Sequence, residues 1–119
     1  MIFDEVVEKT VEGTAGGLAS LIMATDGISI SRYLKPEAEM DLEVLGIEYA
    51  NLLSEIKQAS ETMKAGGLKE VSLATDKYVT IMRLLTSEYF IALVMKPDGN
   101  QGKGRFLLRV NAPALIKEF

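Results

Sequence analysis

The segment spanning residues 99–104 (GNQGKG) comes nearest to a motif that does chemistry. It lies between an expected strand and an expected helix, where a phosphate-binding loop would present its backbone N–H groups. That motif needs four residues between its glycines and a Ser or Thr after the lysine, whose hydroxyl holds Mg²⁺. Here only Asn100 and Gln101 separate the glycines, and Gly104 follows Lys103. We therefore interpret the segment as a flexible connection.

Carboxylates are the other candidates for chemistry. Asp26 precedes a glycine between two apolar runs, so it is either a reactive carboxylate or part of a turn. An Asp-Gly pair there is typical of a hairpin with a type I′ turn, and we predict the hairpin. A second acidic group consists of Glu37, Glu39, Asp41 and Glu43. Its spacing fits no EF-hand, whereas acidic residues are favoured at a helix N-terminus, so we expect no metal site.

The sequence contains no histidine and no cysteine. This excludes a Ser-His-Asp triad, a thiolate nucleophile and the cysteine-rich zinc or Fe–S sites. An enzyme would have to work with carboxylates, Lys, Tyr or a bound Mg²⁺ ion. We therefore predict that the protein is not an enzyme and binds no cofactor.

Charge and hydropathy exclude further classes. The net charge of −4 argues against nucleic-acid binding, which normally uses a basic patch, and against a polybasic membrane-surface module. No apolar run approaches the roughly 18 residues that span a bilayer. The acidic N-terminal segment does not resemble a signal peptide. We expect a cytoplasmic protein.

The spacing of apolar residues predicts three helices and five strands in one domain, residues 1–119. Helices are expected at 3–12, 41–64 and 105–119, with Asp41 as the N-cap of the long middle helix. Strands are expected at 18–24, 28–34, 68–75, 78–86 and 89–95, the first of them buried on both faces. Residues 96–103 read as a loop. Pro113 should kink the last helix or split it after Val110.

The order of these elements predicts an α+β sandwich. The links between the last three strands are short enough only for hairpins, so the sheet should be antiparallel, with about five strands and helices on its faces. The long helix carries one apolar stripe at three- and four-residue steps. A second apolar set lies beside that stripe and comprises Val44, Ile47 and Ala50. This helix therefore has more apolar surface than one sheet needs.

Together these features resemble a roadblock/dynein-light-chain domain of the bacterial MglB-like kind. The resemblance rests on the first hairpin (GGLASLIMATDGISIS), the long helix (DLEVLGIEYANLL), the strand series (LKEVSLATDKYVTIMRL and YFIALVMKPDGNQGKGRFLLR) and their order. It covers nearly the whole chain. The ending VNAPALIKEF departs from the pattern, because its proline breaks a final helix that is usually uninterrupted in the family.

The resemblance implies a profilin-like sandwich with the long helix on one sheet face and the terminal helices on the other. It also implies a homodimer, in which the long helices pack together and the third strands join across the two-fold axis. The residues agree, because an uncovered strand at 68–75 would be a template for pairing. The expected dimer interface comprises Val44, Ile47, Ala50, Val71 and Leu73.

Members of the family bind small Ras-like GTPases or act as scaffold subunits, and bacterial members resemble GTPase-activating proteins. The leading hypothesis is therefore a homodimer that binds such a GTPase and modulates its nucleotide cycle without catalysis of its own. The expected partner surface lies on the long helix and comprises Glu43, Glu48, Asn51 and Glu55. Two alternatives stay open: a small-ligand sensor of profilin- or PAS-like architecture, and a structural scaffold subunit of a larger complex.

Overall fold

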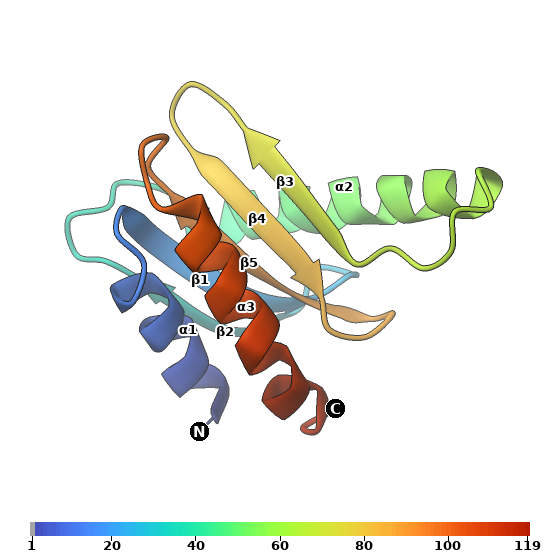
Figure 1. Ribbon diagram of the computed structural model, residues 1–119, viewed down its shortest axis with the longest axis horizontal. Coiled ribbons are helices and arrows are strands. Elements are labelled where there is room, and N and C mark those ends of the chain that lie inside the picture. The colour runs from blue at the N-terminus through green and yellow to red at the C-terminus, as the bar shows by residue number, and fades with distance from the viewer. Residues whose placement is uncertain (1) are drawn as a thin grey trace.

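The computed structural model describes residues 2–119, which fold into three helices and five strands. In chain order these are α1 (Ile2–Glu12), β1 (Gly17–Ala24), β2 (Ser29–Leu34), α2 (Leu42–Thr62), β3 (Glu70–Ala74), β4 (Val79–Leu84), β5 (Tyr89–Met95) and α3 (Gln101–Ile116). The strands form one antiparallel sheet in the order β2-β1-β5-β4-β3, with α1 and α3 on one face and α2 on the other (Figure 1). The predicted α+β sandwich is confirmed.

Strand β1 lies in the interior of the sheet, and all its residues are buried. It pairs antiparallel with both neighbours, so that Leu21 lies opposite Arg32 of β2 and Ala92 of β5. Helices cover both faces of the sheet, so the side chains on both sides of β1 are shielded from water. The apolar run at 18–24 is interrupted by Ser20, whose hydroxyl donates to the carbonyl of Ala92 at 2.8 Å, and it satisfies that requirement.

Side chains that alternate along the strands enter two separate hydrophobic cores. Ile22 and Leu93 belong to the core under α1 and α3, and Met23 belongs to the core under α2; none of the three is more than 2% exposed. Glycines let the helices approach the sheet closely. A Cβ at Gly46 of α2 would lie 2.6 Å from Met23 Cε, and one at Gly104 of α3 would lie 2.7 Å from Leu93 Cδ2.

Side-chain caps fix the starts of the two longer helices. Asp41 caps α2 as predicted, since its Oδ1 accepts a hydrogen bond from Val44 N at 3.2 Å. Helix α3 begins at Gln101 rather than at residue 105, because Asn100 Oδ1 accepts from Lys103 N at 3.0 Å. The predicted loop at 96–103 is therefore wrong from Gln101 onward.

Helix α3 runs unbroken through Pro113, so the predicted split after Val110 is wrong, and the alternative of a kink stays a prediction. A proline lacks the N–H that would donate to the carbonyl of Arg109, one turn earlier. Pro113 lies on the exposed side of α3, where water can satisfy that carbonyl. The final helix thus follows the family pattern although its sequence does not.

The first hairpin is confirmed, but its predicted type I′ turn is wrong. A type I′ turn requires positive φ at both central residues, but of Asp26 and Gly27 only Gly27 has positive φ (99°). The loop has three residues, closed by bonds from Gly27 N to Ala24 O at 2.9 Å and from Ala24 N to Ile28 O at 2.8 Å. Asp26 Oδ1 accepts from Ile28 N at 3.3 Å, so its carboxylate has a structural role.

The second half of α2 extends past the sheet (Figure 1). Leu42, Tyr49 and Leu53, in its first two-thirds, are at most 5% exposed. Ala59 and Met63 continue the predicted apolar stripe, yet both are exposed, Met63 by 69%. The stripe is thus buried only where α2 lies over the sheet, and the remainder is exposed to solvent.

Candidate interaction surface

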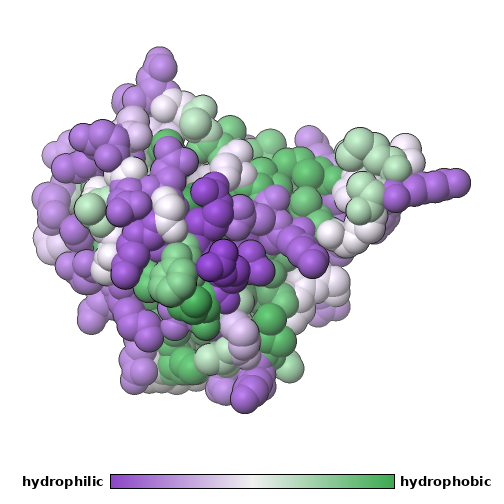
Figure 2. Space-filling view, in the orientation of Figure 1, coloured by the Kyte–Doolittle hydropathy of each residue, from purple (hydrophilic) through white to green (hydrophobic). Residues whose placement is uncertain are grey.

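Large apolar side chains are exposed on α2 and on β3, which border the same side of the molecule. They are Val44 (55% exposed) and Ile47 (43%) of α2 and Leu73 (37%) of β3, and we call them the α2–β3 surface. Leu52 is 37% exposed but lies about 140° around α2 from Ile47, outside this surface. Figure 2 shows hydrophobic side chains gathered where β3 and α2 lie in Figure 1. Clustered apolar exposure of this kind is typical of a protein–protein contact.

Strand β3 forms one edge of the sheet and pairs only with β4. The backbone groups along its outer side therefore lack a neighbouring strand. Ser72, Leu73 and Ala74 are exposed, so no side chain shields this part of the edge. An open edge next to exposed apolar groups favours pairing with another strand.

The five residues expected at the dimer interface differ in how exposed they are. Val44, Ile47 and Leu73 are exposed on the α2–β3 surface. Val71 is half-buried and packs against the core under α2. Ala50 is only 1% exposed and lies within that core, so it supports α2 from beneath and does not line the surface.

The four residues expected to contact a partner are all exposed. Glu48, Asn51 and Glu55 follow one another at three- and four-residue steps, which places them on one side of α2. Glu43 points elsewhere: its carboxylate lies 4.0 Å from Arg32 of β2. The structure therefore groups three of the four and separates Glu43 from them.

A cleft of about 460 Å³ opens where α2 leaves the sheet. Its walls include Lys57 of α2, Leu68 before β3, and Arg83 and Leu84 of β4. Lys57 Nζ donates to the carbonyl of Ser87 at 3.1 Å and closes one end. The cleft lies beside the second half of α2 and shares no lining residue with the α2–β3 surface.

Glu70 ties β3 to the rest of the molecule, a role that the sequence did not indicate. Arg105 of α3 donates from Nε to Glu70 Oε2 at 2.8 Å and from Nη2 to Ser72 Oγ at 2.8 Å. Arg83 lies opposite Glu70 on β4, with its Nη1 3.6 Å from Glu70 Oε1. Glu70 and Arg105 are 35 positions apart and carry no local signal of such a contact, which depends on the packing of α3 beside β3.

Two tyrosines have raised pKa values, and both act as structural ties. Tyr49 shares a 2.8 Å hydrogen bond with Thr80 Oγ1 beneath α2, and burial raises its pKa. On the opposite face Tyr33 donates to Glu12 at 2.7 Å, and this hydrogen bond, with lesser contributions from burial and nearby carboxylates, raises the pKa of Tyr33 to about 12. Both hydroxyls therefore stay protonated at neutral pH.

The remaining candidate motifs have structural roles in the fold. The glycine–lysine segment continues into α3, whose buried Gly104 packs against β5. Within residues 2–119, no group of three or more acidic side chains is arranged to hold a metal ion. Among the same residues, no helix has both the length and the apolarity needed to cross a membrane.

Solved structures resemble this chain, although no family model and no curated protein matches it. MglC from Myxococcus xanthus is 43% identical over 100% of both chains, with a TM-score of 0.72. The gliding protein MglB from Thermus thermophilus is 15% identical over 98% of this chain and 87% of its own, with a TM-score of 0.86. A roadblock/LC7 domain from Streptomyces avermitilis is 15% identical over 95% of this chain and 97% of its own, with a TM-score of 0.77.

The two structures of low identity show the shared fold alone. The identity to MglC over the full length of both chains is high enough to show common descent. Together with the sandwich described above, it shows that the chain belongs to the roadblock/LC7 family, in the group of MglB- and MglC-like domains.

Proposed function

We propose that the protein is a homodimeric regulator or scaffold that binds a small Ras-like GTPase and modulates its nucleotide cycle without catalysis of its own. The observation that carries the proposal is the exposed α2–β3 surface beside an open strand edge. Val44 and Ile47 are about half exposed on α2, and β3 lacks a neighbour on its outer side. A second copy of the same surface would bury both features at once.

The dimer would join the two β3 edges and place one α2 beside the other. Such a contact is isologous, since the same residues are used on both subunits. It would continue the sheet through the partner and cover the apolar groups of both helices. Val44 precedes Glu48 by four residues, so Glu48, Asn51 and Glu55 lie on the same side of α2 as the proposed contact, and a GTPase would contact them at its edge.

The effect on a GTPase would arise from binding rather than from a catalytic group in this chain. A partner that binds one state of a switch loop more tightly shifts the loop toward that state. The MglB structure is described as that of a gliding protein, so we further propose a role in a gliding-motility system. Such a role requires a surface and no internal active site.

The dimer is tested by an Ile47→Glu variant, which would place a carboxylate in the proposed contact. Light scattering should show a dimer for the native chain and a monomer for the variant. Ile28→Glu is the matched control, because Ile28 is 63% exposed in the first hairpin, away from β3, and should leave the dimer intact. A dimer mass for Ile47→Glu would refute this placement of the interface.

The partner is tested by measuring GTP turnover of a small Ras-like GTPase with and without this protein. We expect a changed turnover rate, and a Glu48→Lys, Glu55→Lys variant should reduce the change while the dimer mass is kept. If neither binding nor a rate change is seen with the native chain, the regulatory role is wrong. Intrinsic GTP hydrolysis by this protein alone would contradict the absence of catalysis.

A further inference from the structure

The two helices on the other face of the sheet carry opposite charges. Helix α1 has four carboxylates and one lysine: Asp4, Glu5, Glu8 and Glu12 against Lys9. Helix α3 has no acidic residue between Gln101 and Ile116, and its basic residues are Lys103, Arg105 and Arg109, followed beyond the helix by Lys117 and the acidic Glu118. In an acidic chain, this separation makes one half of the face negative and the other half positive.

The helices lie side by side and run in opposite directions (Figure 1). Near one end, a Cβ on Gly13 would lie 3.0 Å from Leu107 Cδ1. Near the other, the ring of Phe119 stacks on that of Phe3 with centroids 5.3 Å apart. The negative and positive halves of the face are therefore two adjacent strips whose long axes are parallel.

Most of these charges are not neutralised within the chain. The ion pairs among residues 2–119 involve Arg32, Arg83 and Arg105, so of the basic residues on α3 only Arg105 is paired, through Glu70. Lys103 and Arg109 lie 5.7 Å from the ring centre of Phe106 on α3. Their cations are held near an aromatic ring and remain available to an external carboxylate.

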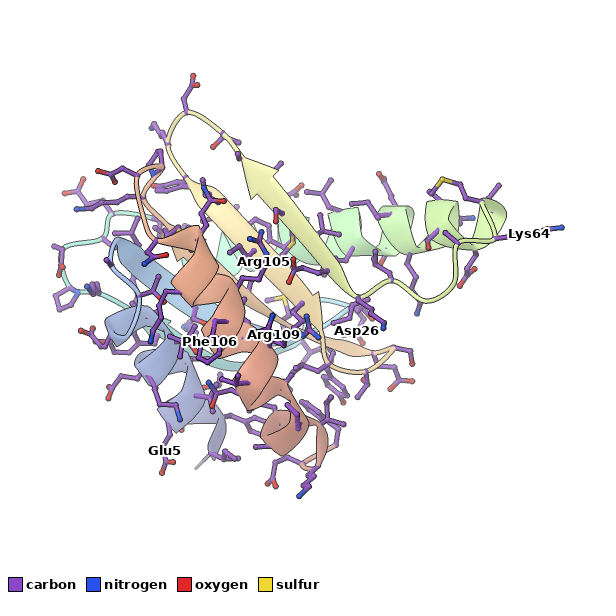
Figure 3. All side chains as sticks on the ribbon, in the orientation of Figure 1. Glu5, Asp26, Lys64, Arg105, Phe106 and Arg109 are labelled. Atoms are coloured by element: carbon purple, nitrogen blue, oxygen red, sulfur yellow. The ribbon has the colours of Figure 1, made fainter. Side chains whose placement is uncertain are left out.

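Two exposed apolar side chains on α3 lie beside these cations and form what we call the Phe106 ridge. Phe106 is 45% exposed and Val110, one turn later, is 49% exposed. Figure 3 shows Phe106 and Arg109 next to each other on α3, and Figure 2 shows hydrophobic side chains there bordered by strongly hydrophilic ones. Aromatic side chains and arginine are the groups enriched at protein interfaces.

We propose that this face binds the same face of a second copy of the chain. A two-fold axis parallel to the helices and between them would lay α1 of each copy over α3 of the other. Each crossing then pairs an acidic helix with a basic one, and the Phe106 ridge packs on the aliphatic stems of α1 side chains. An unrelated acidic partner would instead meet repulsion from the carboxylates of α1 beside its site.

This contact lies on the sheet face opposite α2, so it does not compete with the proposed α2–β3 dimer. One contact can therefore join dimers formed by the other into larger assemblies. Apart from Arg105, which is partly buried and paired, the charges on these helices are exposed, so the contact should be weak and should dissociate as salt screens it over about 10 Å at 0.1 M. Reversible assembly at high local concentration is the expected behaviour.

The test is a charge swap in two variants. One reverses α3 through Arg109→Glu and Lys117→Glu; the other reverses α1 through Glu5→Lys and Glu8→Lys. Sedimentation velocity at low salt should show the native chain forming species larger than the α2–β3 unit. Each variant alone should associate at least tenfold more weakly. An equimolar mixture should recover the large species, since both crossings again pair opposite charges.

Two controls separate charge from folding and from total charge. The variant Arg109→Lys, Lys117→Arg keeps the charges and should associate like the native chain. The variant Lys64→Glu, Lys77→Glu changes net charge equally at the end of α2 and in the β3–β4 turn, away from α1 and α3, and should also associate normally. Circular dichroism should show the native fold for every variant used in the comparison.

The outcomes are distinct from those for the α2–β3 dimer. Repeating the experiment in the Ile47→Glu background measures the α1–α3 contact without the other interface. No concentration-dependent association of the native chain, or a mixture that stays dissociated, would overturn the proposal. Loss of association on reversing α3 but not α1 would also overturn it, because it indicates a partner other than α1 of a second copy.

Discussion

The buried hydrogen bond between Tyr49 and Thr80 fixes α2 on the sheet and can be tested by a double-mutant cycle. The hydroxyls are 2.8 Å apart, and the two residues are 4% and 2% exposed. Tyr49→Phe leaves the Thr80 hydroxyl buried without this partner, which should cost about 1–3 kcal/mol of unfolding free energy. At roughly 4 °C per kcal/mol for a domain of this size, the melting temperature should fall by about 4–12 °C.

The reverse change should have a similar cost for the opposite reason. Thr80→Val leaves the Tyr49 hydroxyl in the core without an acceptor or donor, again at about 1–3 kcal/mol. The double variant removes both polar groups and should be much closer to native stability than the sum of the single changes. We expect a coupling free energy of about 1–2 kcal/mol.

The assay is urea unfolding of the four proteins followed by circular dichroism, at one protein concentration because self-association adds to apparent stability. The mass measured by light scattering should stay unchanged, since neither side chain lies on the α2–β3 surface. Additivity of the two single changes within about 0.5 kcal/mol would refute the reasoning. It would mean that each hydroxyl finds water when the other is removed.

Three further changes test other contacts. Arg105→Ala removes two hydrogen bonds to β3 and should cost about 1 kcal/mol, so hydrogen exchange of the β3 amides should become about fivefold faster. The control Arg109→Ala should leave this exchange rate unchanged. Pro113→Ala restores a helix donor and should stabilise the protein by about 2 kcal/mol in thermal unfolding; a lower stability would contradict a continuous α3. The pKa of Tyr33 is raised to about 12, so the stabilisation by its hydrogen bond to Glu12 is complete below pH 10 and is lost as pH rises toward 12. Tyr33→Phe should remove that part of the loss of stability at alkaline pH, and one late tyrosine transition in the ultraviolet titration.

Local sequence signals were enough to predict the order and type of every element. The apolar run of β1, the alternation in the later strands and the cap at Asp41 are each encoded within a few neighbouring residues. The same local patterns supported the family resemblance, which the identity to MglC confirms. Boundaries were less secure at α3, because a loop rich in glycine and polar residues conceals the Asn100 cap.

The candidate surface was predicted in part. Helical periodicity showed that α2 has more apolar residues than one sheet needs, and Val44 and Ile47 are indeed exposed. Periodicity cannot show which side of a helix meets the sheet, however, and it placed Ala50 on the surface when the side chain lies in the core. Periodicity also cannot show that α2 extends beyond the sheet, which leaves Met63 exposed.

By itself, then, the sequence determined the fold class, because hydrophobic periodicity is a local property that each segment carries. Only the tertiary structure decided which charges meet, because that depends on strand register and on the packing of distant helices. Glu70 joins Arg83 and Arg105 through the register of β3 and the position of α3. The acidic α1 and the basic α3 become one bipolar face only when the sheet brings the two ends of the chain together.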